Sequence, residues 1–200
     1  MKLSIYVPAY NEEDWVIRAL ESIPIRDDIE VIVVDDGSTD NTLQKVMNFK
    51  KKTKLNMRVI ACSDNQGISY ANNVGIDCCK GEYMYVIDAD DYVYTDKFDE
   101  AVNQLDGTDI VYINAITNEE RVMIPSEDNH NLCAGWFKFI RTDFMQGIRR
   151  KITCYGGDYD MWKELIDKPH TSKHIDSIVY HYNYPRVGSV TWRREHEGLK

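Results

Sequence analysis

The sequence has no long hydrophobic run, and no segment approaches the length of a membrane-spanning helix. Its first residues lead directly into a strand pattern, without the basic region, apolar stretch and cleavage site of a secretory signal. The five cysteines are scattered and include no C-x-x-C pair, which is typical of reduced thiols in the cytosol. We therefore expect a soluble, cytoplasmic protein without a transmembrane segment.

Positive charge is also scarce. Lysine and arginine number 24 against 33 aspartates and glutamates, a formal net charge of −9. Binding of nucleic acid or an anionic membrane by bulk charge is therefore not expected. No G-x-G-x-x-G follows the first apolar segment, residues 3–7, and this absence excludes a Rossmann-type dehydrogenase.

The chain also lacks internal repeats, low-complexity tracts and linkers. Its 200 residues with 43% hydrophobic content are enough for one domain with a core of its own. We therefore expect a single domain over residues 1–200.

Strand and helix patterns alternate over the first 90 residues. Apolar runs rich in β-branched residues indicate strands at residues 3–8, 30–34, 58–61 and 83–88. Apolar stripes at helical spacing indicate helices between them, and we expect Asn11 to cap the first. Because such strand–helix–strand units cross over right-handedly, the sequence predicts an α/β fold with a mostly parallel central sheet and helices on both faces.

After residue 91 the pattern changes. The expected elements are a helix at residues 98–105, a β-hairpin at 109–115 and 121–124, and a helix at 161–166. We therefore distinguish a nucleotide-binding half, residues 1–91, from a second half, residues 92–200, that shapes the acceptor side.

Three carboxylates crowd the end of the fourth predicted strand, at Asp88, Asp90 and Asp91. Like charges this close repel, and a hard divalent cation such as Mg²⁺ or Mn²⁺ would relieve the repulsion. An EF-hand does not fit, because Tyr92 stands at the next ligand position. A second acidic strand end lies at Asp36, and ligands of open α/β sheets bind beyond such ends. The pattern predicts a metal-assisted site for a phosphorylated ligand.

Four motifs occur in an order and at intervals that resemble a known family. They are Val7-Pro8-Ala9-Tyr10-Asn11-Glu12, Val33-Val34-Asp35-Asp36-Gly37-Ser38-Thr39-Asp40-Asn41-Thr42, Asn65-Gln66-Gly67-Ile68-Ser69 with Asn73-Val74-Gly75, and Asp88-Ala89-Asp90-Asp91. The chain resembles GT-A-fold, inverting family-2 glycosyltransferases, closely over its first half and loosely over its second. This resemblance implies a nucleoside-diphosphate-sugar donor, most often a UDP-sugar, and a glycan or lipid-linked glycan as acceptor, which would bring the protein to a membrane surface.

The resemblance also implies roles for the donor-side residues. Asp36 would accept a hydrogen bond from the uracil ring, and Asp88 would face the ribose hydroxyls. Asp36 alternatively serves only as a turn residue. The implied donor-binding set is Pro8, Ala9, Tyr10, Asn11, Asp36, Gly67, Asp88, Ala89 and Arg186.

The cofactor implied by the resemblance is Mn²⁺ or Mg²⁺. Asp90 would bind the ion that bridges the two phosphates, and His181 would complete its shell. The alternatives are that the acidic cluster is a solvated surface loop and that His181 is structural.

An inverting transfer needs one base for the acceptor hydroxyl. By the resemblance Asp158 occupies the base position, although Gly157 stands where the family has glutamate. Asp160 is the second candidate, and Asp158 would also serve as a helix cap.

Other positions depart from the family. Asn72 replaces its usual arginine, with Arg186, Arg193 or Arg194 as substitutes, and Trp136-Phe137-Lys138 resembles a Trp-Asn-Lys element near the acceptor. The Gln-x-x-Arg-Trp signature of processive synthases and the glycine-rich phosphate loop of sugar nucleotidyltransferases are both missing. We expect transfer of a single sugar, with a non-catalytic nucleotide-sugar- or glycan-binding protein as the alternative.

Overall fold

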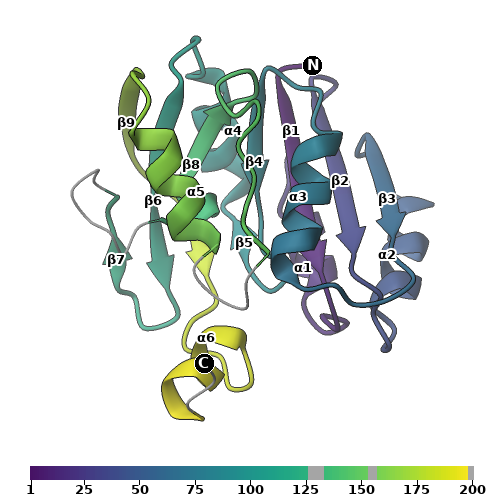
Figure 1. The fold of residues 1–200 in the computed structure, drawn as a ribbon. Helices are drawn as coiled ribbons and strands as arrows, with labels where there is room; N and C mark the ends of the chain where they lie inside the picture. The colour runs from purple at the N-terminus through teal and green to yellow at the C-terminus, as the bar shows by residue number, and fades with distance from the viewer. Residues whose placement is uncertain (126–132, 153–156, 198–200) are drawn as a thin grey trace.

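The computed structural model describes residues 1–125, 133–152 and 157–197. In these ranges the strands form one mixed sheet in the order β3-β2-β1-β4-β8-β6-β9-β5, with β7 paired to β6 (Figure 1). The strands are β1 (Leu3–Ala9), β2 (Ile29–Asp35), β3 (Met57–Ala61), β4 (Tyr83–Val86), β5 (Tyr92–Val93), β6 (Ile110–Thr117), β7 (Val122–Met123), β8 (Lys138–Arg141) and β9 (Ser172–Tyr182). The helices are α1 (Val16–Glu21), α2 (Thr42–Lys50), α3 (Ile68–Cys78), α4 (Thr95–Asn103), α5 (Gly157–Ile166) and α6 (Val190–His196), with a 3-10 turn η2 (Gly135–Phe137).

The parallel pairing expected for the first half is confirmed. β1 lies between β2 and β4 and is parallel to both, and β3 is parallel to β2. Every residue of β1 and β2 is buried, as in a parallel sheet covered by helices on both faces. Figure 1 shows α3 and α5 in front of the sheet and α2 and α4 behind it.

Ser4 and Glu30 are polar side chains that are buried within these strands. The Ser4 hydroxyl donates to Glu30 Oε1 at 2.6 Å, and Arg58 Nη2 pairs with Glu30 Oε2 at 2.9 Å. The carboxylate thus has partners for both oxygens, which is the condition under which a buried charge is tolerated.

The second half of the sheet is mixed. β8 runs antiparallel to β4 and β6, while β9 runs parallel to β6 and antiparallel to β5. The predicted hairpin is confirmed as the antiparallel pair β6 and β7. The sequence did not predict β8 or β9, because β9 mixes charged and apolar residues and its burial follows no simple alternation.

Two predicted boundaries near the first strand were wrong. Pro8 does not end β1 but pairs with Val34 inside it; the ladder with β4 stops at Tyr6, so the missing N–H of Pro8 faces no strand partner. Asn11 does not cap α1, which begins at Val16. Instead Asn11 has a φ of 55° and its side chain accepts from Thr39 N at 2.8 Å.

The predicted fourth strand also ends earlier than expected, at Val86 instead of Asp88. Residues 88–91 form a turn in which Asp91 N donates to Asp88 O at 3.0 Å. The carboxylates of this turn therefore lie beyond the end of β4 and outside the sheet. Figure 1 places the C-terminal segment with α6 at the end toward which β1, β2 and β6 point.

No helix in residues 1–125, 133–152 or 157–197 is long and apolar enough to cross a membrane.

Candidate active site

The first acidic strand end holds a loop in place. Asp36 is buried at the end of β2, and its carboxylate accepts from Gln66 N at 3.1 Å and Gly67 N at 2.7 Å. Its own backbone N–H donates to Ala9 O at 2.9 Å. The structure therefore brings Ala9, Asp36 and Gly67 together, from three segments that the sequence predicted for the donor.

Two further donor residues lie beside this group. Asn11 N donates to Ser38 Oγ at 3.0 Å, so the loop after β1 joins the loop after β2. Tyr10 is 42% exposed and stands at the open rim, whereas Pro8 is part of β1. At Gly37, with a φ of 70°, an added Cβ would lie 2.5 Å from the carbonyl carbon of Asp64, so glycine permits this close loop contact.

The second acidic strand end contains one structural carboxylate. Asp91 is fully buried, accepts from the Tyr180 hydroxyl at 2.6 Å and accepts from Asn183 N at 2.8 Å. Burial raises the pKa of Asp91 well above its ordinary value, with contributions from Asp90 and Asp88. Asp91 therefore anchors β9 and the chain after it.

Asp90 is bound by two arginines from distant segments. Its Oδ2 pairs with Arg186 Nη2 at 2.7 Å, and its backbone carbonyl accepts from Arg18 Nη2 at 2.6 Å. The Arg186 guanidinium also reaches Glu12 Oε1 at 2.9 Å. Glu12, Asp90 and Arg186 thus form one network, which we call the Arg186 bridge.

Sequence reasoning did not assign Glu12 to the site. Burial, and next the charge of Asp90, raise its pKa to about 7. Burial and Asp90 likewise raise the pKa of Asp88 to about 7. Glu12 is the last residue of the motif Val7-Pro8-Ala9-Tyr10-Asn11-Glu12, and its place in that motif is the sequence feature that could have pointed to it.

The carboxylates fit a divalent cation in chemistry. Asp88, Asp90 and Glu12 offer hard oxygen donors, and Glu12 Oε2 is buried without a hydrogen-bond partner among the described residues. Burial, and next the charge of Asp90, raise the pKa values of Asp88 and Glu12, and a cation bound beside them would favour their ionised forms. Within the described part of the chain, however, no three His, Cys, Asp or Glu side chains are already grouped to hold a metal ion.

The structure does not bring His181 to Asp90. His181 Nδ1 faces the Tyr94 hydroxyl at 3.1 Å, Nε2 faces Asn118 Oδ1 at 2.8 Å, and the ring stacks on Tyr92 at 4.4 Å. Both ring nitrogens are engaged, so metal binding by His181 would require these contacts to break.

The two candidate bases have different surroundings. Asp158, in the first turn of α5, forms an ion pair through Oδ1 with Nη1 of the buried Arg150. Asp160 pairs with Lys151 at 3.0 Å, and both of these side chains are more than a third exposed. Asp158 and Arg150 both act electrostatically on Asp88, which indicates that Asp158 adjoins the donor side.

Residues 136–138 lie in the core. Trp136 is buried and stacks on Tyr180 at 4.7 Å. The buried Lys138 donates to the carbonyls of Cys133 at 3.1 Å and Ala134 at 2.7 Å, and burial lowers its pKa to about 7. In this structure the residues that resemble the acceptor element are therefore buried, and their side chains support the segment that enters β8.

In the described part of the chain, neither Asn72, which stands in place of the family's arginine, nor Arg193 forms a hydrogen bond or ion pair with the site carboxylates. Asn72 is buried and donates to Ile68 O at 2.8 Å within its own helix, and Arg193 is exposed. Cys154, Gly156 and the side chain of Arg194 lie outside the described residues.

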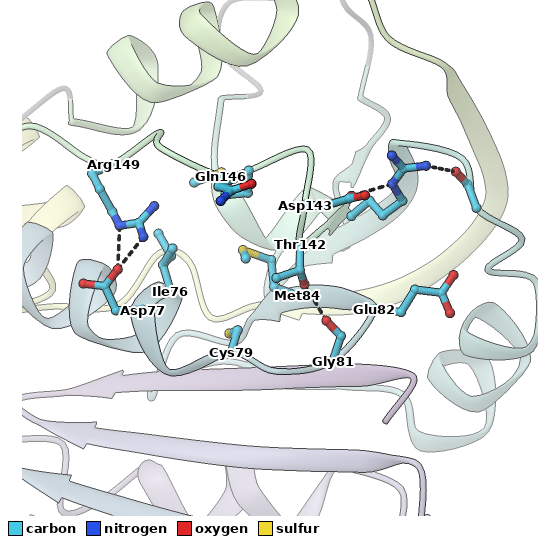
Figure 2. A pocket seen from close by; sticks show the side chains of 13 residues that line it. Ile76, Asp77, Cys79, Gly81, Glu82, Met84, Thr142, Asp143, Gln146 and Arg149 are labelled. Carbon is cyan, nitrogen blue, oxygen red and sulfur yellow. Dashed lines mark hydrogen bonds and ion pairs between the residues drawn. The ribbon is translucent and has the colours of Figure 1, made fainter.

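A cavity of about 650 Å³ lies at the amino end of β4, opposite to the end that the carboxylates follow. Figure 2 shows Arg149 paired with Asp77 at one side of it, and the Thr142 hydroxyl donates to Gly81 O at 2.7 Å. Because ligands of such sheets bind at the carboxyl ends of the strands, this cavity is separate from the carboxylate site.

Comparison with known proteins adds independent information. A sequence profile described as glycosyl transferase family 2 matches residues 4–161. TarS of Staphylococcus aureus, a poly(ribitol-phosphate) beta-N-acetylglucosaminyltransferase, is 36% identical over 111 residues, which are 53% of this chain and 19% of TarS. A poly(ribitol-phosphate) beta-glucosyltransferase of Bacillus spizizenii is 41% identical over 98 residues, 46% of this chain and 15% of that protein.

Two solved structures share the fold. Residues 1–349 of S. aureus TarS, in complex with UDP-GlcNAc, match with a TM-score of 0.82 at 25% identity, over 94% of this chain and 60% of that one. Mannosyltransferase PcManGT from Pyrobaculum calidifontis, with GDP-Man and Mn²⁺, matches with a TM-score of 0.75 at 20% identity, over 96% and 59% of the two chains. The second likeness concerns the fold alone, and this chain spans less than a fifth of the two curated relatives named above.

Proposed function

This chain belongs to glycosyl transferase family 2 and has the GT-A fold, and from that premise we propose that it transfers one sugar from a UDP-sugar to a hydroxyl group of a glycan or lipid-linked glycan, with inversion at the anomeric carbon. The observation that carries the proposal is the position of Asp36 and Asp90. They follow β2 and β4, the two strands that flank β1 and run parallel to it, so both lie beyond the carboxyl ends of these strands.

The donor end of the site is assigned to the loops after β1 and β2. Asp36 and the loop that it holds at Gln66 and Gly67 would receive the uracil ring, with Pro8, Ala9, Tyr10 and Asn11 around the base and ribose. The similarity to TarS, whose structure with UDP-GlcNAc matches this chain, supports a UDP-sugar.

The diphosphate end is assigned to the second acidic cluster. Asp90 would hold Mn²⁺ or Mg²⁺, with Asp88 beside it, and a divalent ion bound there would neutralise charge that develops on the leaving diphosphate. Arg186 would contribute further positive charge, and its ion pair with Asp90 supports this role. His181 remains a candidate ligand that would first have to leave Tyr94 and Asn118.

The acceptor end is assigned to Asp158, within residues 92–200. Asp158 would take the proton of the acceptor hydroxyl as that oxygen bonds to the anomeric carbon. The sugar–phosphate bond breaks in the same displacement and releases the nucleoside diphosphate. Asp160 remains the alternative base.

A donor screen tests the proposal. The Tm of the purified chain is measured with UDP, GDP, UDP-GlcNAc or UDP-glucose, in Mn²⁺ or in EDTA. In a separate assay, release of UDP is measured with poly(ribitol phosphate) or a panel of glycans as acceptor. We expect UDP compounds with Mn²⁺ to raise the Tm, and UDP release to depend on acceptor. Stabilisation by GDP alone would contradict the role of Asp36. Tight UDP binding without turnover on any acceptor would favour a nucleotide-sugar-binding protein.

A further inference from the structure

The segment that leads from β8 to α5 carries a buried arginine that the proposed reaction has not yet used. Asn73 of α3 binds its backbone from both sides: Arg150 N donates to Asn73 Oδ1 at 2.9 Å, and Asn73 Nδ2 donates to Arg150 O at 2.8 Å. These two hydrogen bonds with one side chain fix the position and the orientation of the backbone at Arg150.

Two glycines leave room for the Arg150 side chain. A Cβ at Gly135 would lie 3.0 Å from Arg150 Nη2 and 2.7 Å from Val86 Cγ1. A Cβ at Gly157 would lie 3.7 Å from Arg150 Cβ and 3.0 Å from Ser69 Oγ. The absence of side chains at these positions lets the guanidinium pass between β4 and the start of α5.

The charge of Arg150 is directed at two carboxylates. Its side chain is 7% exposed and forms the ion pair with Asp158, whose side chain is 38% exposed. The same guanidinium acts on Asp88 and on the Tyr6 hydroxyl. Because the arginine is buried and the carboxylate is partly exposed, the surrounding protein fixes the guanidinium, and the guanidinium in turn orients the carboxylate.

We propose that Arg150 is the positioning residue of Asp158: it holds this carboxylate oriented through Oδ1, so that the other oxygen receives the proton of the acceptor. This inference rests on the proposed function, because it gives Asp158 the role of base. It also explains how the chain tolerates Gly157, since orientation of Asp158 comes from Arg150 rather than from its neighbour in sequence.

A mutant cycle tests the inference. Wild type, Arg150→Met, Asp158→Asn and the double variant are assayed for UDP release from UDP-GlcNAc with Mn²⁺ and poly(ribitol phosphate), and donor KM and kcat are separated. We expect Arg150→Met to lower kcat by roughly tenfold to a hundredfold with little change in donor KM, the scale of a misplaced catalytic group. In the Asp158→Asn background the same change should add little, because its target is already gone.

Two further variants complete the design. Arg150→Lys keeps the charge and should recover part of kcat, and it replaces Arg150→Met in the cycle should that variant not fold. Arg149→Met is the matched control, because Arg149 pairs with Asp77 at the separate cavity, and it should retain wild-type kcat.

The outcomes separate the two hypotheses. If wild type transfers sugar and Arg150→Met lowers kcat by the same factor with and without Asp158, the residues act independently and the inference is overturned. If Arg150→Met keeps wild-type kcat, it is overturned as well. If wild type binds UDP-GlcNAc but transfers to no acceptor, the proposed function fails, and with it the role given to Arg150.

Discussion

At the scale of single residues, charge compensation organises the site. Four carboxylates follow two neighbouring strands, Glu12 after β1 and Asp88, Asp90 and Asp91 after β4, and of these Asp91 is the most deeply buried. Asp91 already has two hydrogen bonds, from Tyr180 and Asn183, whereas Asp90 depends on arginine. Asp90 is therefore the carboxylate best able to exchange a protein partner for a ligand.

Asp90→Asn tests this distinction. Removing the charge should abolish the part of UDP stabilisation that requires Mn²⁺ and most of the transfer, because the amide is a poorer ligand for a hard cation. The measurement is the Tm with UDP, with and without Mn²⁺. Asp143→Asn is the control, since Asp143 pairs with Arg141 at the surface. Unchanged turnover in Asp90→Asn would refute the metal assignment.

Asp158→Asn tests the base. We expect transfer to fall by roughly a hundredfold or more, the scale of losing a positioned general base, with donor affinity nearly intact. Donor affinity is measured by titration with UDP-GlcNAc, and transfer by UDP release. Asp160→Asn should keep most activity because its carboxylate pairs with Lys151 at the surface. The reverse result would assign the base to Asp160.

At the scale of elements, close packing between helices and strands determines where the site residues stand. The loop before β8 is held by Lys138, whose ammonium also lies 4.6 Å from the Trp162 ring of α5. α3 approaches β1 so closely that a Cβ at Gly75 would lie 2.6 Å from the Tyr6 ring. These contacts set the spacing between the donor strands and α5.

The buried Lys138 gives a pH dependence of stability. Its folded pKa of about 7 is below the ordinary lysine value, so between these two pKa values the unfolded chain binds the proton and the folded chain does not. The free energy of unfolding therefore gains up to about 2 kcal/mol from pH 7 to pH 9, and this contribution is absent below pH 7. Urea unfolding of wild type and Lys138→Met at several pH values measures it, because other titrating groups cancel in the difference. A constant difference between the two proteins would contradict the lowered pKa.

Gly75→Ala tests the contact between α3 and β1. Alanine is the better helix former by about 1 kcal/mol, yet its methyl group would overlap the Tyr6 ring. We expect a net loss of about 1–3 kcal/mol in the free energy of unfolding, measured in urea. Gly147→Ala is the comparison, because that site has open space but a φ of 83°, and it should lose only about 1 kcal/mol. Equal stability of Gly75→Ala and wild type would show that α3 can move away from β1.

At the scale of the whole molecule, segments from the beginning and the end of the sequence meet at the site. Arg186 is 174 residues from Glu12, and the Arg186 bridge joins the segment after β9 to the loops after β1 and β4. Asp91 adds a second link through Tyr180 and Asn183. The C-terminal segment is therefore tied to the strand ends by charge as well as by the sheet.

Arg186→Met tests this closure. Without the guanidinium, Glu12 and Asp90 lack their cation, so we expect a loss of about 1–3 kcal/mol and a Tm lowered by several degrees in EDTA. Mn²⁺ should then raise the Tm more in the variant than in wild type, because the ion replaces a missing charge. Arg193→Met, at an exposed position, is the control. A Tm in EDTA equal to that of wild type would exclude a closing role for Arg186.

Local pattern was enough to predict the first half of the molecule. Strands such as β2, with its unbroken β-branched run, and helices with apolar stripes are encoded within a few residues, and short βαβ connections leave one handedness. The carboxylates beyond the strand ends were predictable for the same reason, since Asp36 comes directly after β2 and Asp90 comes four residues after the end of β4. The first motif pointed to Pro8, Ala9, Tyr10 and Asn11, although not to the strand boundary at Pro8.

Tertiary structure alone decided which charges meet. Glu12 with Arg186 and Arg150 with Asp158 are pairs between segments whose separation in sequence carries no periodic signal, so no local pattern predicts them. The same holds for His181. The family resemblance predicts it as a metal ligand, whereas in the structure it contacts Tyr92, Tyr94 and Asn118. Sequence by itself determined the strands of the first half and the carboxylates that follow them, because these depend on neighbours along the chain. The fold decided their partners, because an ion pair depends on distance in space.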